Sequence, residues 1–482
     1  CTPRTHEPLF QDSIRDVGLN RYLFELANIR EQCSWCHMDN QQEATRKAID
    51  IVNMHINKIS RQPPLSTGSV DVTPAALVIG GGIAGITTAI SLGDQGYSVH
   101  LVEQEDKLGG MLSSVYRTLG EKDVQSFLQG KIEEVYKHGN IRVYTNDRVE
   151  NTEGFVGNFN TTLASGERID HGATIITIGG ENYQPREYEY KENENIITQR
   201  ELGEKLHKHP PEPGEHYIMI QCVGSREEPH NYCSRICCQE AVQNAIALKE
   251  ACPECAVTIL YRDVRTYGLK EDYYTKARNL GVLFVRYTPD TKPQVEVGEN
   301  QLTVGMYDHI LNRTVATNAD YIVLSAGIRP HASSNEIAEK FKLTKNEDGF
   351  FLEAHVKLSP VDFPTEGIFF AGLAHAPKNL EETISQAQAA AGRAGTLLSR
   401  ESLEVSGTVA SHDPNNCMSC LSCLRICPYD SPYLDEEGKV RHNEVKCMGC
   451  GLCAGVCPGK AFQVNKFEDK QILAMVDAAA SA

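Results

Sequence analysis

Residues 75–90 read Ala-Ala-Leu-Val-Ile-Gly-Gly-Gly-Ile-Ala-Gly-Ile-Thr-Thr-Ala-Ile. A short apolar strand runs into Gly80-x-Gly82-x-x-Gly85, and a helix of small residues is expected to follow. Glycines at these positions let the backbone approach a pyrophosphate that sits at the helix N-terminus. The next predicted strand ends in Glu103, where an acid accepts hydrogen bonds from ribose hydroxyls. The stretch therefore predicts an α/β dinucleotide-binding fold.

Further glycine turns indicate which dinucleotide binds. Glu103 is followed by Leu108-Gly109-Gly110-Met111, which resembles the Glu-x5-Gly-Gly signature of FAD-dependent disulfide-reductase-like proteins. Residues 173–180 and 319–327 resemble the strand-to-glycine turns that bracket the second domain of these proteins. Residues 367–372 resemble the strand that closes on the flavin at Gly372, and the helix from Glu382 is expected to present its N-terminus to the flavin ring. Leu373 stands where most relatives have an Asp that contacts the ribityl chain of the flavin, so this contact is not expected here.

The composition excludes several classes of protein. The 482 residues include 47 Lys and Arg against 64 Asp and Glu, a net charge of −17, which disfavours nucleic acid and acidic membrane surfaces as partners. No run approaches the roughly 18 apolar residues of a membrane helix, and the first residues show no charged-then-apolar leader. The sequence therefore predicts a cytoplasmic protein without a membrane span. Its 17 cysteines are expected to bind metal, because a cytosol keeps disulfides reduced.

The C-terminal cysteines form two matching runs. Residues 417–428 read Cys-Met-Ser-Cys-Leu-Ser-Cys-Leu-Arg-Ile-Cys-Pro, and residues 447–458 read Cys-Met-Gly-Cys-Gly-Leu-Cys-Ala-Gly-Val-Cys-Pro. In this C-x2-C-x2-C-x3-C-P pattern three thiolates bind one 4Fe–4S cluster and the fourth binds the other cluster. Two zinc knuckles would leave no role for the fourth Cys-Pro of each run. The expected ligand sets are Cys417, Cys420, Cys423 and Cys457 for one cluster, and Cys447, Cys450, Cys453 and Cys427 for the other.

A strand in the middle of the chain lacks the glycine fingerprint. Residues 217–221 read Tyr-Ile-Met-Ile-Gln, where a nicotinamide-binding domain would begin, but Cys222-Val-Gly-Ser-Arg follows with a single glycine. No cradle for a second pyrophosphate is therefore expected. Four cysteines occur there instead, Cys222, Cys233, Cys237 and Cys238, with the last three in a predicted helical stretch. Their spacing fits either a third iron–sulfur cluster beside the flavin or buried structural thiols, and both interpretations stay open.

Four strings carry a resemblance to one family. They are Cys-Thr-Pro-Arg-Thr-His-Glu-Pro from Cys1, residues 18–35 around Cys33, Gln221-Cys-Val-Gly-Ser-Arg, and Cys233-Ser-Arg-Ile-Cys-Cys. Over nearly the whole chain the sequence resembles the flavin subunit of heterodisulfide reductase, the HdrA family. The resemblance implies a cluster at Cys222, Cys233, Cys237 and Cys238, and N-terminal cluster ligands at Cys1 and Cys33.

The same resemblance implies an activity and partners. It implies flavin-based electron bifurcation, in which a two-electron donor reduces FAD and the two electrons part toward ferredoxin and a disulfide. The expected partners are HdrB-like and HdrC-like subunits, a hydrogenase or formate dehydrogenase-type input subunit, ferredoxin, and a separate N-terminal subunit. The expected setting is methanogenesis, and no catalytic side chain is assigned beyond the flavin.

Three departures limit this resemblance. The family's N-terminal cluster region is missing before Cys1, which predicts a processed or partial product or one half of a split protein. Because Cys1, Cys33 and Cys36 offer three thiolates at most, a fourth cluster needs a ligand from outside the chain. Gln243 stands where relatives commonly carry a lysine that approaches the flavin. Cys252-Pro-Glu-Cys255 matches nothing in the family, and a loop with two free thiols is expected there.

The expected organisation has four parts. Residues 1–72 form a partial N-terminal cluster domain and linker, and 73–216 with 318–398 form the FAD-binding domain. Residues 217–317 form an inserted Rossmann-like domain with the cluster site, and 405–482 form a bacterial-type ferredoxin domain. The fold class is therefore α/β, a thioredoxin-reductase-like fold of two dinucleotide domains with a C-terminal two-cluster ferredoxin domain. The expected cofactors are FAD, three complete 4Fe–4S clusters and a fourth at the N-terminus.

Three functions are compared. The first is an HdrA-type oxidoreductase that bifurcates electrons, which the overall resemblance favours. The second is a non-bifurcating electron conduit in a quinone-interacting or related redox complex, which Gln243 favours because a neutral side chain stabilises an anionic flavin less. The third, an NAD(P)H-dependent reductase, is opposed by the missing fingerprint at Cys222.

Overall fold

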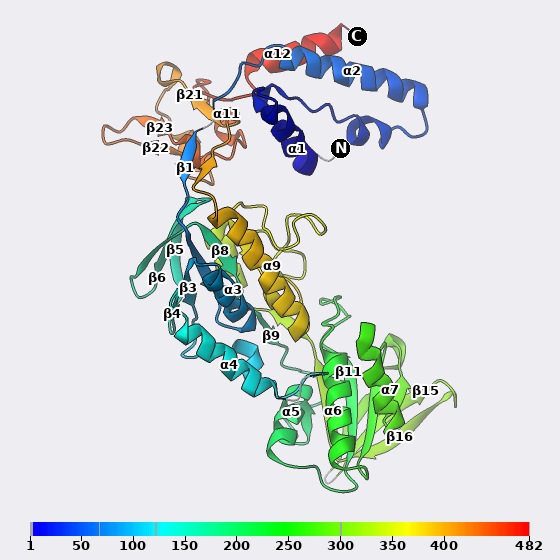
Figure 1. The fold of residues 1–482 in the computed structure, drawn as a ribbon. Helices are drawn as coiled ribbons and strands as arrows, with labels where there is room; N and C mark the ends of the chain where they lie inside the picture. Colours follow the sequence, from blue (N-terminus) through cyan, green and yellow to red (C-terminus); the bar gives the residue numbers. More distant parts are fainter. Residues whose placement is uncertain (1–2, 67, 121–122, 299–300, 482) are drawn as a thin grey trace. The chain divides into compact units, whose positions relative to one another are not determined.

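The chain folds into two compact units. The computed structural model describes residues 3–66, 68–120, 123–298 and 301–481. One unit comprises residues 73–400, and the other combines the residues up to Val72 with those from Glu401 onward. Figure 1 draws both units and labels many of their helices and strands. The described helices include none with both the length and the apolar character that crossing a lipid bilayer requires.

The unit of residues 73–400 begins with a five-stranded parallel sheet. Its strands, in spatial order, are β19 (Ile368–Phe370), β8 (Ala173–Ile176), β2 (Ala75–Ile79), β3 (Ser98–Val102) and β4 (Ile141–Tyr144). All five residues of β2 are buried, as expected for a central parallel strand that is covered on both faces. The sheet therefore brings the glycine fingerprint after β2 beside Glu103 after β3.

Helices cover this first sheet. α3 (Ile83–Asp94) and α9 (Leu380–Leu398) lie side by side (Figure 1), and Ala387 and Ala391 are fully buried. Small side chains allow this close approach of the two helices. α4 (Val124–Lys137) and the antiparallel sheet β5 (Val149–Phe155), β6 (Asn158–Leu163) and β7 (Arg168–His171) complete the layers.

A second five-stranded parallel sheet lies in the same unit. Its strands, in spatial order, are β10 (Ile196–Thr198), β17 (Tyr321–Ala326), β11 (His216–Val223), β12 (Ala256–Tyr261) and β13 (Leu283–Arg286). β10 and β17 lie outside residues 217–317, so the second sheet extends beyond the predicted segment on both sides. The difference arises because β17 pairs along β11, a long-range contact that periodicity along the chain does not reveal.

Helices and a small sheet surround the second sheet. They are α5 (Gln199–Lys208), α6 (Cys237–Ala251), α7 (Glu271–Asn279), and the antiparallel strands β14 (Gln294–Val297), β15 (Leu302–Asp308) and β16 (Arg313–Ala319). The chain passes between the two large sheets through the antiparallel pair β9 (Gly180–Asn182) and β18 (Ile328–Pro330). Two parallel sheets connected in this way form the expected pair of Rossmann-like layers.

The other unit contains the C-terminal cysteine runs. Each run continues into a short helix, α10 (Ser422–Ile426) or α11 (Leu452–Val456), and the two helices contact each other. The flanking strands form two antiparallel pairs: β21 (Ala410–His412) with β24 (Phe462–Val464), and β22 (Pro432–Leu434) with β23 (Val440–His442). Both halves of the run pattern therefore share one small core that includes Cys423, Cys453 and Phe462.

The N-terminal residues pack on the end of the same chain. α1 (Pro3–Asp16) ends just before the chain turns at Gly18, which has a left-handed conformation with φ +85°. α2 (Gln41–Ile59) packs against α12 (Asp469–Ala480). Part of the core around the N-terminal residues is therefore supplied by α12 of the same chain.

Candidate functional site: a cavity between two parallel sheets and three cysteine groups

One large cavity lies in the unit of residues 73–400. Its volume is about 550 Å³, within the usual range of small-molecule and cofactor sites. One part of its wall is the glycine turn after β2 together with Glu103, and another part comes from α6 of the second sheet. We call the part lined by Arg200, Gln239, Gln243, Lys270 and Lys378 the α6 side of the cavity.

The glycine turn packs too closely for side chains at two of its positions. A Cβ at Gly85 would lie 1.8 Å from the carbonyl oxygen of Gly80, and a Cβ at Gly80 would lie 2.4 Å from that of Thr177. A Cβ at Gly82 would meet no atom within 4 Å, and Gly82 lines the cavity. Gly82 is also the N-cap of α3, whose first N–H groups lack helical partners. The turn therefore fits the pyrophosphate of a dinucleotide.

Glu103 closes the same part of the cavity. Its carboxylate accepts hydrogen bonds from the backbone N–H of Gly81 at 2.6 Å and of Glu105 at 2.9 Å, and the residue is 7 % exposed. Each carboxylate oxygen has a second lone pair. Glu103 thus holds the glycine turn in place and keeps acceptor capacity toward the cavity, where the ribose is predicted to bind.

The second glycine pair supports the first turn. Gly109 and Gly110 have φ values of +126° and +51°, which L side chains rarely adopt. The N–H of Gly109 donates to the carbonyl oxygen of Gly81 at 2.9 Å, and a Cβ at Gly110 would lie 3.1 Å from the Cα of Gly82. The Glu-x5-Gly-Gly segment therefore lies directly against the pyrophosphate turn.

The turn after β19 contributes backbone and apolar surface to the site. Gly372 has φ +75°, and a Cβ there would lie 2.9 Å from the Cβ of Ala84. Leu373, which stands in place of the family's Asp, lines the cavity. The carbonyl oxygen of Gly372 accepts a hydrogen bond from Lys378, a residue that the sequence did not single out.

Several buried donors on the α6 side have no partner among the described residues. Arg200 pairs with Glu240 through Nη2 at 2.8 Å, but its Nε and Nη1 have no hydrogen-bond partner. The same holds for Nε2 of Gln239, which is 6 % exposed, and for Oγ1 of Thr118. Because an unpaired buried polar group is costly, these atoms fit a ligand with acceptors, such as the carbonyl oxygens of a flavin.

Sequence reasoning missed these α6-side residues. Arg200 belongs to α5, Gln239 to α6, Lys270 precedes α7, and Lys378 precedes α9. Gln243 also lines the cavity, as the resemblance implies for this position. No motif links the four segments along the chain, so only the packing of the two sheets reveals that positive charge reaches this side from Arg200, Lys270 and Lys378.

The four middle cysteines come together at the second sheet. Cys222 is the next-to-last residue of β11, with φ +64°, and Cys237 and Cys238 begin α6. Cys233 lies in the loop between them and is not in a helix, contrary to the prediction. Burial, and then the neighbours Cys238, Cys222 and Cys233, raise the pKa of Cys237 well above its usual value. Burial raises the pKa of Cys238 to about 12. A cationic iron cluster would offset this cost of forming thiolates.

This cysteine group adjoins the cavity. Ile236 and Gln239, which flank the pair Cys237-Cys238 in the sequence, both line the α6 side. Cofactors at these two places would therefore both lie next to the first turn of α6.

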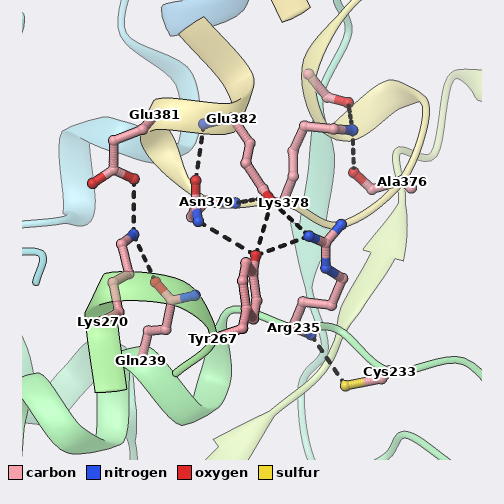
Figure 2. A network of polar contacts seen from close by, with 11 residues as sticks. Cys233, Arg235, Gln239, Tyr267, Lys270, Ala376, Lys378, Asn379, Glu381 and Glu382 are labelled. Atoms are coloured by element: carbon pink, nitrogen blue, oxygen red, sulfur yellow. Dashed lines mark hydrogen bonds and ion pairs between the residues drawn. The ribbon is translucent and has the colours of Figure 1, made fainter. Parts of the chain in front are cut away.

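A polar network connects the cysteine loop to α9. The backbone N–H of Arg235 donates to Sγ of Cys233 at 3.4 Å, and its guanidinium donates to Glu382 at 2.6 Å and to Tyr267 at 2.8 Å (Figure 2). Lys270 bridges Gln239 and Glu381 nearby. The network ties the cysteine loop to the helix that the sequence places at the flavin ring.

The C-terminal cysteines line two separate small cavities. The structure groups Cys417, Cys420 and Cys423 with Cys457 in one cavity, and Cys447, Cys450 and Cys453 with Cys427 in the other. These are the two predicted ligand sets, with the fourth cysteine of each run in the cavity of the other run. Among the described residues, no three Cys, His, Asp or Glu side chains are arranged to bind a single metal ion. A 4Fe–4S cluster needs a wider arrangement, because its four cysteine ligands bind four different irons.

The remaining cysteines lie apart from these groups. Cys33 is 2 % exposed and its thiol donates to the carbonyl oxygen of Ala44 at 2.7 Å, while Cys36 is exposed. Cys1 lies outside the described residues. Cys252 and Cys255 are buried in the core of the second sheet, so this segment holds two packed thiols rather than an exposed pair.

Comparisons with known proteins agree with these sites. The family described as FAD dependent oxidoreductase matches residues 76–165, and the family described as 4Fe-4S dicluster domain matches residues 416–461. The first contains the glycine turn and Glu103, and the second contains both cysteine runs.

Relatives match along nearly the whole chain, and all three described here are HdrA proteins. The CoB–CoM heterodisulfide reductase iron–sulfur protein HdrA 2 of Methanopyrus kandleri is 33% identical over 540 residues, covering 91% of this chain and 82% of that protein. The corresponding HdrA of Methanocaldococcus jannaschii is 32% identical over 578 residues, covering 99% and 88%. The HdrA of the H(2):CoB–CoM heterodisulfide,ferredoxin reductase of Methanothermobacter thermautotrophicus is 32% identical over 580 residues, covering 99% and 87%.

Among solved structures, thioredoxin reductase of Lactococcus lactis is similar with a TM-score of 0.47 and 16% identity, covering 67% of this chain and 98% of that one.

Proposed function

This chain belongs to the HdrA family of CoB–CoM heterodisulfide reductase, and from that premise we propose how it moves electrons. It is a flavin and iron–sulfur oxidoreductase of the heterodisulfide reductase type, with an FAD-binding domain and a 4Fe–4S dicluster domain. FAD, when bound, accepts an electron pair and releases single electrons. The proposal concerns where the cofactors bind, how many there are and which route the electrons take.

One observation carries the proposed route. The residues on either side of Cys237-Cys238 line the cavity whose wall includes the glycine fingerprint. FAD in that cavity would therefore place its ring beside a cluster held by Cys222, Cys233, Cys237 and Cys238. Together with the two C-terminal ligand sets, this gives three complete clusters, or about twelve irons per chain.

We favour flavin-based bifurcation between a two-electron donor, ferredoxin and a disulfide-reducing subunit. The relatives include a protein whose name joins heterodisulfide and ferredoxin reduction, and Arg200, Lys270 and Lys378 supply positive charge on the α6 side. The alternative is a non-bifurcating conduit, because Gln243, which lines the cavity, is neutral. The proposed partners are ferredoxin, HdrB-like and HdrC-like subunits, and a hydrogenase or formate dehydrogenase-type input subunit.

Two measurements on anaerobically prepared protein test this function. Iron and flavin analysis should give about twelve irons per FAD; about eight would remove the cluster at Cys222 and the proposed route. A potentiometric titration followed by EPR then separates the alternatives. Bifurcation requires the flavin to take both electrons in one step, whereas two well-separated one-electron steps would favour the conduit.

A further inference from the structure

Lys378 is a buried lysine just before α9. It precedes Asn379, the N-cap of that helix, and it lines the α6 side of the cavity although the residue is only 8 % exposed. Its Nζ donates to the carbonyl oxygens of Gly372 and Ala376, at 2.7 Å each (Figure 2). Because an ammonium has three donors, one donor remains for a ligand in the cavity.

This position is unfavourable for a positive charge in the protein alone. The N-terminus of a helix carries partial positive charge, and in the described part of the chain Lys378 forms no ion pair with a carboxylate. The other two cations are paired: Arg200 with Glu240 at 2.8 Å and Lys270 with Glu381 at 3.0 Å. A buried charge without a partner is costly. The position of Lys378 therefore suits a positive charge that pairs with an anion formed in the cavity.

Burial and the charged groups around Lys378 lower the pKa of its ammonium group. Arg235, Glu382 and His375 are the charged or titratable groups that face it, and His375 is paired with Glu353 at 3.0 Å. Burial, and then Arg235, lower the pKa of Lys378 to about 7, against the opposing effect of Glu382. Burial and Lys378 also lower the pKa of His375, so His375 stays neutral when Lys378 titrates.

We propose that Lys378 balances the negative charge of the reduced flavin, and that it takes up a proton when the flavin is reduced. The inference rests on the proposed flavin site. Two electrons and one proton convert the oxidised ring to its singly negative reduced form, and a second proton from solvent converts the Lys378 amine to an ammonium. The electrons come from the two-electron donor of the complex, and the net charge of the site does not change.

The test is the pH dependence of the flavin midpoint potential in the full chain. The protein is titrated anaerobically with dithionite, and the flavin band is read after subtraction of the cluster signals. Above about pH 7 the native protein should bind two protons per electron pair, so that the reduction equilibrium changes about a hundredfold per pH unit, or about 59 mV. Lys378→Gln should bind one proton, which gives about tenfold per pH unit, or about 30 mV, and a more negative potential.

Two further variants make the result specific. Lys378→Arg keeps the charge but cannot release its proton, so it should keep the native potential at neutral pH and show the one-proton slope. Lys270→Gln removes the same charge from the same cavity, but from a side chain already paired with Glu381, and should keep the two-proton slope.

The outcomes separate this inference from the flavin site itself. A two-proton slope in Lys378→Gln, or a one-proton slope in Lys270→Gln, would overturn the role of Lys378. If Lys378→Gln retains no FAD, Lys378→Arg decides, since a two-proton slope there is incompatible with the proposal. A native protein that retains no FAD would instead contradict the proposed function.

Discussion

The two parallel sheets of residues 73–400 have similar architecture and differ in the connection from a central strand to the helix that follows it. In the first, β2 ends at Ile79 and α3 begins at Ile83, so a tight glycine turn connects them. In the second, β11 ends at Val223 and α6 begins at Cys237, so a long loop intervenes. Ligands of such sheets bind at the carboxyl ends of the strands. The position of the site therefore depends on the sheet, whereas the kind of ligand that fits depends on the strand-to-helix connection.

The connection from β11 to α6 is packed with side chains, whereas the turn from β2 to α3 leaves open space at Gly82. A Cβ at Gly224 would lie 2.2 Å from the ring of Tyr183, and Arg329 donates to the carbonyl oxygen of Gly224. Ser234, which is fully buried, accepts a hydrogen bond from the N–H of Ile328 at 2.8 Å. A pyrophosphate needs free N–H groups and open space at a helix N-terminus, and here thiols occupy the first turn of α6 instead.

The largest effect is expected from closing the open turn. Gly82→Val should lower FAD affinity by at least about a hundredfold, or about 2.8 kcal/mol, because the side chain would extend into the cavity where Gly82 has no neighbour within 4 Å. The backbone at Gly82 is extended, with φ −72° and ψ 179°, so the fold should be retained. FAD content and the thermal unfolding midpoint measure the two effects.

Gly130→Val is the matched control for this variant. Gly130 lies in α4, away from the cavity, and a Cβ there would also meet nothing within 4 Å. It should retain FAD with little change in stability, because Val has a slightly better helix propensity than Gly. Full FAD content in Gly82→Val would contradict the assignment of the turn.

The next effect tests the cysteine connection of the second sheet. Cys237→Ala should lose about four of about twelve irons and retain FAD, because one cubane loses a ligand while the glycine turn is unchanged. Cys255→Ala is the control, since Cys255 is buried in the same domain at 1 % exposure and is not a proposed ligand. Equal iron content in the two variants would mean that the group at Cys222 is a set of structural thiols.

A further cluster is expected to depend on the N-terminal residues. We propose a fourth cluster at Cys33 whose remaining ligands come from outside the described residues or from a separate subunit. In the native complex, Cys33→Ala should lose about four irons and leave FAD content unchanged. An unchanged iron count would leave Cys33 as the buried thiol that donates to Ala44.

The last prediction is that NADH and NADPH do not reduce the flavin of the isolated chain. NADH or NADPH mixed anaerobically with the isolated chain should not bleach the flavin, because residues 221–226 offer no pyrophosphate cradle. Stopped-flow absorbance is the assay. Bleaching within the time of a normal turnover would show that the second sheet binds a dinucleotide after all, and would restore the NAD(P)H-dependent reductase.

The sequence by itself determined the features that depend on short spacing. The glycine turn, Glu103 and the two C-terminal cysteine runs can each be recognised as a group along the chain, because neighbouring residues and a few regular hydrogen bonds fix their geometry. The cross-grouping of Cys427 and Cys457 also followed, since the run pattern itself requires it.

Contacts between segments far apart in the sequence are seen only in the tertiary structure. Arg200, Lys270 and Lys378 reach one side of a cavity from three separate elements, β17 pairs with β11, and α2 packs on α12. No local pattern marks these contacts, because burial and charge pairing depend on which surfaces meet after folding. The chain's spacing thus identified which cofactors to expect, and its packing identified the charged groups that would surround the flavin.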